Sequence, residues 1–574
     1  MNLSASRALA RPAALGIVLL AATWFFGRGY ADPTLVKSDE ALYAAAALEL
    51  SRGDNPLYPR GEFSHYRTLG KPPGALWPAA LSLKIFGRGK AAVRLPTILA
   101  GIASTVLLAL LASIIASSSL AGLLTGLLAL TIGGWIELGR VIWLENTLTA
   151  VFLLALWLAS RTRDESDPRT ERILQVLLGL VVGYGAWVKH MVGFASLGAV
   201  VVAELTLDPT LLVSPRRLWR RFGVTIVVAL AFFGLWMVPF TLDRGVGAAL
   251  HQIPAKLAAD PHVPRKVDDL WQTFLRFGEP WLVVVGSLCL LALLTLALVQ
   301  PASLATDEVP PPSTRWQRTA RLILGAPSAE TRRFLLLACT ALLASHLLVF
   351  GEIADKHRSW YMIPIFPLFA LGPGIVLGRW LGRGERHLGL LGIPLVAAAL
   401  CILHDDAKHL HWWFLVALAG LLCAQGLHRW LLQVLPAAEL VRAHGLLMLA
   451  GRGLALGAVM WMLGAGLDRS ARRVWAPQPP DTFAEYAAAW EKDPIPYLIV
   501  DRQRWNVPLY YQPSVYFYFS PIEVRPYDLD PPCDTSGLAS GDMVLIHHSK
   551  YDCVAPRARQ LRELSQWWRM VTLH

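Results

Sequence analysis

The sequence predicts an all-α polytopic membrane protein with a small C-terminal α/β domain. Of its 574 residues, 55% are hydrophobic and 16% are charged, and the mean hydropathy of +0.45 is high for a chain of this length. Apolar runs of membrane-spanning length recur along the chain, and short arginine clusters separate them. A soluble fold is therefore not expected. The net charge of +12 follows these clusters rather than one polar face, so it does not indicate nucleic-acid binding.

About thirteen helices account for the apolar runs. A hydrocarbon core of about 30 Å takes roughly 20 apolar residues in a helix, and its interior admits no irregular lipid-facing backbone. The predicted spans are 13–30, 92–114, 117–136, 142–160, 173–189, 191–206, 223–241, 281–299, 333–351, 360–378, 388–403, 412–427 and 446–467. We expect the first to be retained, because it lacks a clear signal-peptide cleavage site.

Arginine placement predicts the orientation. With the N-terminus inside, the clusters in 161–172, 214–221, 301–333 and 378–386 all lie inside. Three long segments then lie outside, namely 31–91, 242–280 and 468–574. We expect a transmembrane domain over 1–467, in which the outer loops 31–91 and 242–280 form the active-site face. In the first loop, Leu42, Ala45, Ala46 and Leu50 recur at helical spacing and predict an amphipathic helix at the membrane surface.

The segment 468–574 changes to a Pro-rich, mixed composition and predicts a soluble α/β domain outside the membrane. Expected strands are YLIVD (497–501), VYFYF (515–519), MVLIH (543–547) and the final MVTLH, whereas AEYAAAWE and ARQLRELSQWW indicate helices. Of the six cysteines, only Cys533 and Cys553 lie together in a polar region that suits a disulfide. No internal repeat, GxxxxGK[ST], HExxH or CxxC motif is present. ATP-driven transport and zinc hydrolysis therefore have no motif to support them.

Several charged residues lie at predicted outer ends of helices or in outer loops. Asp39 and Glu40 follow the first span, either as a solvated pair at a helix N-cap or as functional carboxylates. Lys71 precedes two prolines that fix the backbone direction, and it suits either lipid headgroups or a phosphate. Together, Asp39 and Lys71 offer a carboxylate for an acceptor hydroxyl and a cation for a phosphate.

Glu145 begins an apolar span, where a carboxylate is costly and is usually functional or paired. If Glu145 has no catalytic or binding role, we expect it to lie at the membrane interface and to pair with Arg140. Lys189 and His190 lie at the outer end of the fifth span and raise the same question of function or structure. If Lys189 has only a structural role, its long side chain extends to the membrane surface and keeps the ammonium group in water.

Further along, a cationic cluster precedes Tyr361 on the predicted outer side, against the positive-inside tendency; it consists of Lys356, His357 and Arg358. Such a cluster needs an anionic partner, and a lipid-linked phosphate fits. His262 and Arg265 in DPHVPRK have a weaker claim to a binding role.

These pieces resemble membrane glycosyltransferases of GT-C architecture, specifically the group that includes aminoarabinose transferases and protein O-mannosyltransferases. The resemblance covers about the first 375 residues, and its elements run in the family order. They are DEALYA (39–44), GKPPGALW (70–77), VRLP (93–96), WLENTLT (143–149), GAWVKH (185–190) and KHRSWYMIPIFPLFAL (356–371).

The resemblance implies inverting transfer of a hexose or pentose from a polyprenyl-phosphate carrier to a lipid, glycan or protein acceptor. The place would be the periplasmic face of a bacterial inner membrane. Asp39 would be the catalytic base, and Glu145 would help to position it or the acceptor. The substrate-binding residues would be Lys71, Lys189, Lys356, Arg358, Tyr361, Glu40, Tyr43, His262 and Arg265. A divalent cation is optional, and the sequence offers no clear ligand set for one.

The chain also departs from the aminoarabinose transferases. Three residues that are common in that group differ here. Leu42 stands where those proteins have an arginine, three residues after the first acid, and Gly70 stands where they have an acid directly before the lysine of the Lys-Pro step. His190 stands where they have a glycine after the lysine of the fifth span. These changes weaken any assignment to aminoarabinose or lipid A. Two other classes are a flippase or transporter of polyprenyl-linked glycans and a non-enzymatic scaffold. A transporter would place polar residues near the bilayer midplane, often in repeated halves, whereas here they gather at the predicted outer ends.

Overall fold

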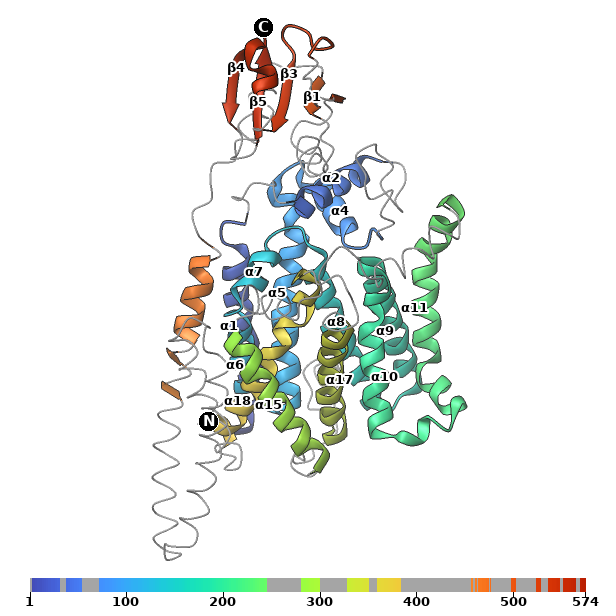
Figure 1. Cartoon of the computed structure of the whole chain (residues 1–574). Coiled ribbons are helices and arrows are strands. Elements are labelled where there is room, and N and C mark those ends of the chain that lie inside the picture. The colour runs from blue at the N-terminus through green and yellow to red at the C-terminus, as the bar shows by residue number, and fades with distance from the viewer. Residues whose placement is uncertain are drawn as a thin grey trace, which may run out of the picture. The chain divides into compact units, whose positions relative to one another are not determined.

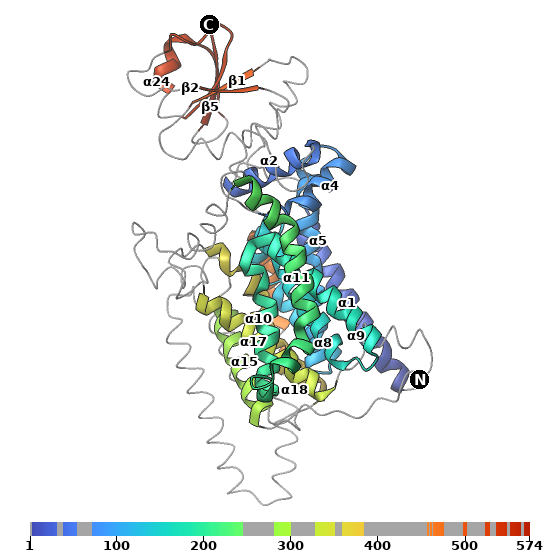
Figure 2. The same cartoon turned by 90° about the vertical axis from the view of Figure 1, so that its right-hand side faces the viewer.

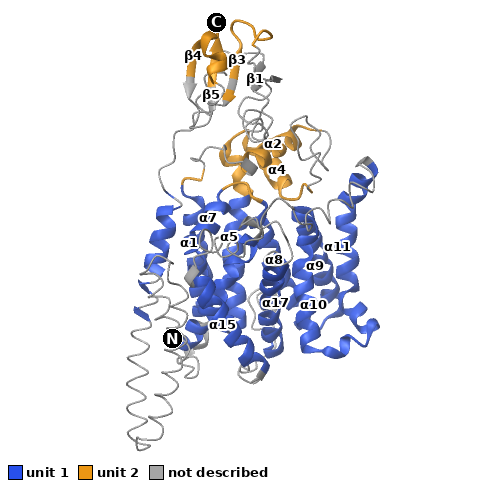
Figure 3. Cartoon of the chain, in the orientation of Figure 1, with its two compact units in different colours: residues 1–28, 97–140, 144–476 blue, residues 29–96, 141–143, 477–574 orange. Residues whose placement is uncertain are grey.

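The computed structural model describes residues 3–30, 38–53, 72–244, 280–299, 328–349, 359–383, 456–457, 460–461, 463–473, 475, 497–501, 523–527, 535–547, 551–563 and 568–574. Figure 1 shows its elements in chain order. The chain divides into two compact units (Figure 3). Unit 1 comprises Met1–Arg28, Thr97–Arg140 and Leu144–Ala476, and unit 2 comprises Gly29–Pro96, Val141–Trp143 and Pro477–His574. The predicted division of the chain after residue 467 stays a prediction.

Unit 1 is built from helices, as the apolar runs predict. Its described helices are α1 (Leu3–Gly27), the greater part of α5 (Lys90–Ile115), α6 (Ser119–Ala129), α7 (Gly133–Gly139), α8 (Leu144–Asp164), α9 (Pro168–Lys189), α10 (Ala195–Leu207), α11 (Pro215–Arg244), α15 (Pro280–Val299), α17 (Ala329–Leu347) and α18 (Leu371–Arg383). Short 3-10 segments join them at η1 (His190–Phe194), η2 (Pro209–Leu211) and η5 (Ser359–Ala370).

Within the described residues, five helical stretches are long and apolar enough to cross a membrane, or six if a bent pair counts as one span. Two predicted spans differ in form from the described helices. The span 117–136 is broken into α6 and α7, which are bent by 75°. The span 360–378 is confirmed within the stretch Met362–Gly382, which is long and apolar enough to cross a membrane. It differs from the prediction in starting as the 3-10 segment η5, because Pro364 and Pro367 lack the N–H groups of a continuous α-helix. The predicted spans 388–403 and 412–427 lie outside the described residues, so a total of about thirteen stays a prediction.

Close helix contacts in unit 1 depend on small residues. A Cβ atom on Gly378 would lie 2.3 Å from the Ala121 Cα, and one on Gly374 would lie 2.0 Å from the Thr125 Oγ1. The two glycines are four residues apart on α18, so together they let this helix approach α6 closely. Elsewhere in the unit, α10 lies beside α17 (Figure 2), and α9 packs between α8 and α11.

In unit 2, helix α2 (Ser38–Arg52) packs on α4 (Leu76–Phe86). Helix α2 covers the range that the apolar spacing indicates, but the expected surface helix is wrong. Every residue from 40 to 50 is buried, Glu40 and Glu49 included. Small alanine side chains lie on all sides of α2, so neighbouring segments can pack closely around the whole helix. The helix is therefore buried on every face and not half exposed.

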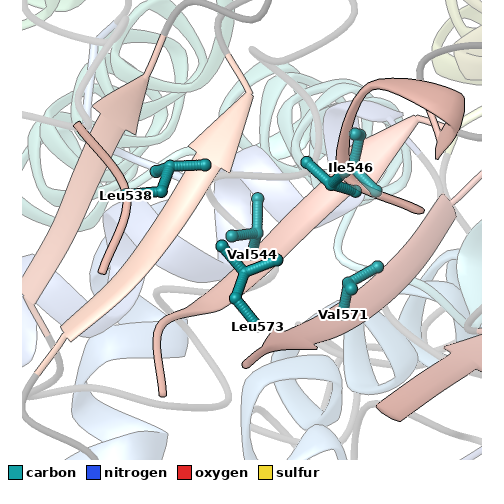
Figure 4. Packing of buried hydrophobic residues seen from close by; sticks show 6 residues of the cluster. Leu538, Val544, Ile546, Val571 and Leu573 are labelled. Carbon is teal, nitrogen blue, oxygen red and sulfur yellow. The ribbon is translucent and has the colours of Figure 1, made fainter. Parts of the chain in front are cut away.

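Unit 2 also contains a five-stranded sheet with the order β2-β1-β3-β5-β4. Its strands are β1 (Tyr497–Asp501), β2 (Glu523–Tyr527), β3 (Met543–His547), β4 (Ala558–Glu563) and β5 (Trp568–Leu573). Strand β1 runs parallel to β2 and β3, whereas β5 is antiparallel to β3 and β4. A small apolar core lies on the sheet (Figure 4) and consists of Leu538, Val544, Ile546, Val554, Val571 and Leu573.

Strands β1 and β3 have the predicted bounds, and β5 contains most of the predicted final strand. The helix expected over 558–568 is wrong, because residues 558–563 form β4 and pair with β5. This pairing supplies the backbone hydrogen bonds that a helix would have supplied locally. The strand 515–519 and the helix AEYAAAWE lie outside the described residues, so a separate α/β domain stays a prediction. Cys553 is disulfide-bonded, and Cys533 lies outside the described residues.

Candidate functional site

The structure describes the side chains of four predicted site residues. Glu145 and Lys189 belong to unit 1, and Glu40 and Tyr43 belong to unit 2. Asp39 lies in the first turn of α2 and Tyr361 lies in η5, with only their backbone described. The remaining predicted residues lie outside the described ranges; they are Lys71, His262, Arg265, Lys356 and Arg358.

Glu145 and Lys189 form a buried ion pair between the Glu145 Oε1 and the Lys189 Nζ. Glu145 stands in the first turn of α8 and Lys189 is the last residue of α9. Because only three residues separate these helices, they run as an antiparallel pair, and the start of α8 meets the end of α9. Both side chains are largely enclosed, with relative exposures of 4% for Glu145 and 11% for Lys189. The predicted alternative, a pair between Glu145 and Arg140, is wrong. Glu145 pairs with Lys189, and the Arg140 Nη2 donates to the carbonyl oxygen of Arg28.

The end of α9 is fixed to α11 on both sides of Lys189. Before it, the Trp187 Nε1 donates to the Phe232 carbonyl oxygen at 2.8 Å. After it, the His190 ring lies edge-on to Trp236 with the ring centroids 5.4 Å apart. The Lys189 backbone is thereby held at both neighbours, which directs its ammonium group toward α8.

The turn after Lys189 has an unusual backbone. His190 has φ 49° and ψ −137°, a conformation that glycine adopts readily and that costs other residues about 1–3 kcal/mol. The following η1 segment then folds back onto α9. A Cβ on Gly193 would lie 2.0 Å from the Gly185 carbonyl carbon, so this approach of two backbones needs glycine.

Next to Glu145, the Asn146 carboxamide is fully buried. Within the described part of the chain, neither its Oδ1 nor its Nδ2 has a hydrogen-bond partner. The amide lies against Gly139, where a Cβ would come within 2.1 Å of the Nδ2 and 2.5 Å of the Phe26 ring. A buried amide in this state costs about 1–3 kcal/mol. The start of α8 therefore combines a buried ion pair with an unsatisfied polar group.

His346 of α17 is a third titratable group at the ion pair. It is 2% exposed, its ring meets Phe152 edge-on at 5.4 Å, and it interacts electrostatically with Lys189. Sequence reasoning missed both residues: His346 lies in an apolar run with no motif around it, and Asn146 lies in WLENTLT but was given no role of its own. Asn146 was nevertheless detectable as a polar residue beside the anomalous Glu145.

In unit 2, Glu40 forms an ion pair with Arg94, with 2.7 Å between the Glu40 Oε1 and the Arg94 Nε. Both side chains are fully buried, and the Arg94 Nη1 also donates to the Tyr30 carbonyl oxygen at 2.9 Å. The pair ties the start of α2, and with it the Asp39 backbone, to the start of α5. Sequence reasoning singled out VRLP but gave its Arg94 no role. Tyr43, one turn further along α2, is buried with its ring edge-on to Trp143 at 6.1 Å.

The described residues contain no group of three or more His, Cys, Asp or Glu that could hold a metal ion. Their chemistry is that of buried carboxylate–cation pairs next to aromatic rings. Such pairs hold charged groups in fixed positions at the ends of helices, an arrangement that can position a polar substrate.

Comparison with known proteins connects this geometry to a family. Residues 70–239 match the sequence model of a family described as dolichyl-phosphate-mannose-protein mannosyltransferase. They contain Glu145, Lys189 and Arg94. A comparison with curated protein sequences gives no significant match.

Solved structures of ArnT show the same fold. The chain aligns with ArnT from Cupriavidus metallidurans, in its apo state and bound to undecaprenyl phosphate. Each alignment covers 97% of this chain and 96% of ArnT, with a TM-score of 0.57 and 18% identity. The arabinosyltransferase EmbB from Mycobacterium smegmatis aligns over 81% of this chain and 42% of its own, with a TM-score of 0.42 and 14% identity. The family match over residues 70–239 confirms the predicted resemblance to GT-C membrane glycosyltransferases, and the ArnT alignment shows it at the level of the fold.

Proposed function

We propose that this protein is an inverting glycosyltransferase that moves a sugar from a polyprenyl-phosphate carrier to an acceptor on the periplasmic face of a bacterial inner membrane. The observation that carries the proposal is the family match over residues 70–239, which includes the buried Glu145–Lys189 pair. The ArnT fold supports the same class of donor, since ArnT has been solved with undecaprenyl phosphate bound. The acceptor is a lipid, a glycan or a protein.

In the proposed reaction, the Asp39 carboxylate accepts the proton of the acceptor hydroxyl. The hydroxyl oxygen then attacks the anomeric carbon, and the bond from that carbon to the phosphate oxygen breaks. Polyprenyl phosphate leaves with the bonding electron pair, so a single displacement inverts the anomeric centre. The cations Lys71, Lys356 and Arg358 stabilise the leaving phosphate, and Tyr361 lines their pocket.

Two described ion pairs support these assignments, each within its own unit. Glu40, locked on Arg94, fixes the start of α2 next to Asp39 in the chain. Glu145 holds the Lys189 ammonium at the end of α9, where Lys189 contributes to binding the donor. We assign supporting roles in substrate binding to Tyr43, His262 and Arg265.

The decisive experiment incubates the purified protein with polyprenyl-phosphate sugars, both hexoses and pentoses, and measures release of the sugar-free carrier. Wild-type protein should consume at least one donor, and Asp39→Asn should abolish consumption while retaining the wild-type thermal unfolding profile. Full activity in Asp39→Asn would refute the assigned base. If a well-folded protein consumes no donor, the transporter class is favoured instead.

A further inference from the structure

Arg28 follows α1 as an exposed cation whose side-chain partners are aromatic rings. Its guanidinium carbon is 5.1 Å from the centroid of the Trp24 ring and 4.4 Å from that of the Trp475 ring. The two tryptophan rings meet edge-on with their centroids 5.9 Å apart, so they form a corner against the guanidinium. Cation–π contacts hold the charge in position but use none of its N–H donors.

Both sides of this corner are held within unit 1. The Arg28 carbonyl oxygen accepts a hydrogen bond from the Nη2 of the buried Arg140. The Trp475 ring stacks on the buried Phe25 ring, with the centroids 5.5 Å apart and an angle of 24° between the ring planes. The guanidinium therefore occupies a preformed position, which lowers the entropy cost of binding a ligand there.

Two arginines that precede Trp475 in the chain have acidic partners. The Arg473 Nε lies 3.0 Å from the Glu137 Oε2, and the Arg472 Nη2 lies 2.7 Å from the Asp468 Oδ2. By contrast, the described residues offer the Arg28 guanidinium no carboxylate and no hydrogen-bond acceptor. Its charge and its N–H donors are therefore open to an anion from outside the chain.

The exposed face of α1 indicates which kind of anion reaches Arg28. The stretch Ala10–Gly27 is long and apolar enough to cross a membrane, and Arg28 follows it directly. Ile17, Leu20 and Trp24 precede Arg28 at helical spacing and are 51%, 73% and 55% exposed, so they form one face, the α1 stripe. In a bilayer this stripe lies against acyl chains, and Arg28 lies at the level of the phosphates.

We propose that the Arg28 guanidinium binds the phosphate diester of an anionic bilayer phospholipid, one acyl chain of which lies along the α1 stripe. The phosphate oxygens accept the guanidinium N–H donors, while the tryptophan rings keep the guanidinium in position. A headgroup without an ammonium group suits the site, because a second positive charge would be repelled by Arg28. The proposal does not rest on the proposed function, since it invokes a lipid of the surrounding membrane and none of the residues assigned to the sugar donor.

The test places the full chain in phosphatidylcholine nanodiscs with a minor fraction of phosphatidylglycerol that carries a photoreactive acyl chain. After illumination, peptide mass spectrometry measures labelling of the α1 stripe relative to Leu291 and Leu298, two exposed apolar residues of α15. Arg28→Gln removes the charge and should reduce this relative labelling about tenfold. Arg28→Lys keeps the charge but loses the planar set of donors, so it should retain part of the labelling.

Arg220→Gln is the matched control for these variants. Arg220 is an exposed arginine of α11, and the described part of the chain gives it neither an aromatic nor an acidic partner. Replacing it removes one exposed positive charge without touching the corner at Arg28. The relative labelling of the α1 stripe should therefore equal that of the wild type.

Competition by unlabelled lipids uses wild-type protein, so it decides the question even if a variant does not fold. Added phosphatidylglycerol should displace the label from the α1 stripe, whereas added phosphatidylcholine should not. Equal displacement by phosphatidylcholine would overturn the proposal, as would unchanged labelling in Arg28→Gln, because acyl chains alone would then fill the stripe. Stronger displacement by undecaprenyl phosphate would also overturn it, since the phosphate would then belong to a carrier lipid.

Discussion

The Glu145 carboxylate at the start of α8 holds the Lys189 ammonium at the end of α9, and both are largely enclosed by protein. Removing one partner leaves an uncompensated buried charge, which typically costs about 3–5 kcal/mol. We therefore expect Glu145→Gln and Lys189→Met to lower the melting temperature strongly. The double variant should lose less than the sum of the two single losses.

The Asp468–Arg472 pair is the matched control for this double-mutant cycle. It spans one helical turn, with relative exposures of 58% for Asp468 and 80% for Arg472. Exposed pairs contribute little because water and salt screen them. Additive losses in the Glu145–Lys189 cycle, as in the control cycle, would contradict a coupled buried pair.

The Glu40–Arg94 pair separates an anchoring role from substrate contact. Arg94→Met should destabilise the protein by about 3–5 kcal/mol, because the Glu40 carboxylate then stays buried without its partner. Adding Glu40→Gln should restore much of this stability, measured by thermal unfolding. If Glu40 only anchors α2, the KM of the double variant for the sugar donor should also return toward the wild-type value. A KM that stays high in the stable double variant would show that Glu40 contacts substrate.

The Gly193–Gly185 contact is testable by adding one methyl group. Gly193→Ala places a Cβ 2.0 Å from the Gly185 carbonyl carbon, so we expect destabilisation of about 1–3 kcal/mol. Gly198→Ala in α10 is the control, since its Cβ meets nothing within 4 Å. Alanine there should stabilise the helix by about 0.5–1 kcal/mol. Equal effects of the two variants on thermal unfolding would contradict the described packing.

Asn146 should be replaceable by leucine without loss of stability. Its amide is buried and has no hydrogen-bond partner within the described residues, so an apolar side chain of similar size removes an unfavourable term. We expect the melting temperature of Asn146→Leu to equal or exceed that of the wild type. Thr225→Val is the contrasting variant, because it removes a 3.1 Å bond to the Gln175 carbonyl oxygen and should cost about 1 kcal/mol. A marked fall for Asn146→Leu would reveal a partner for the amide.

The Asp167 N-cap of α9 predicts a pH dependence. The Thr170 hydroxyl donates to its carboxylate at 2.6 Å and, with the backbone N–H of Thr170, holds the pKa of Asp167 below the ordinary 3.8. Because the pKa of Asp167 is lower in the folded protein than in the unfolded chain, its ionised carboxylate stabilises the fold. This stabilisation is complete at pH values above the pKa of the unfolded chain, and it is lost as the pH falls through the pKa of the folded protein. The melting temperature of Asp167→Ala should therefore lie below that of the wild type at pH 7, and the gap should narrow below about pH 4. A gap that is constant with pH would contradict the assignment.

Local sequence patterns predicted most of the helices and the middle strands. The apolar runs place α5, α8, α9 and α11 close to the ranges observed, because span length follows from the thickness of the hydrocarbon core. Likewise, Val- and Ile-rich runs between turn residues predict β1 and β3. Glu145 and Lys189 were recognisable as anomalies, because charges at the ends of apolar runs need a partner.

Which residues pair was decided by the tertiary structure. Glu145 and Lys189 are 44 positions apart, and only the antiparallel packing of α8 on α9 brings them together in place of the nearer Arg140. The segment 558–563 has the composition of a helix, yet it becomes β4 because β5 offers a paired edge. The sequence by itself determined a multi-span helical chain and the charged residues that need partners. The fold chose the partners, because buried charges and open backbone groups are satisfied by neighbours in space rather than along the chain.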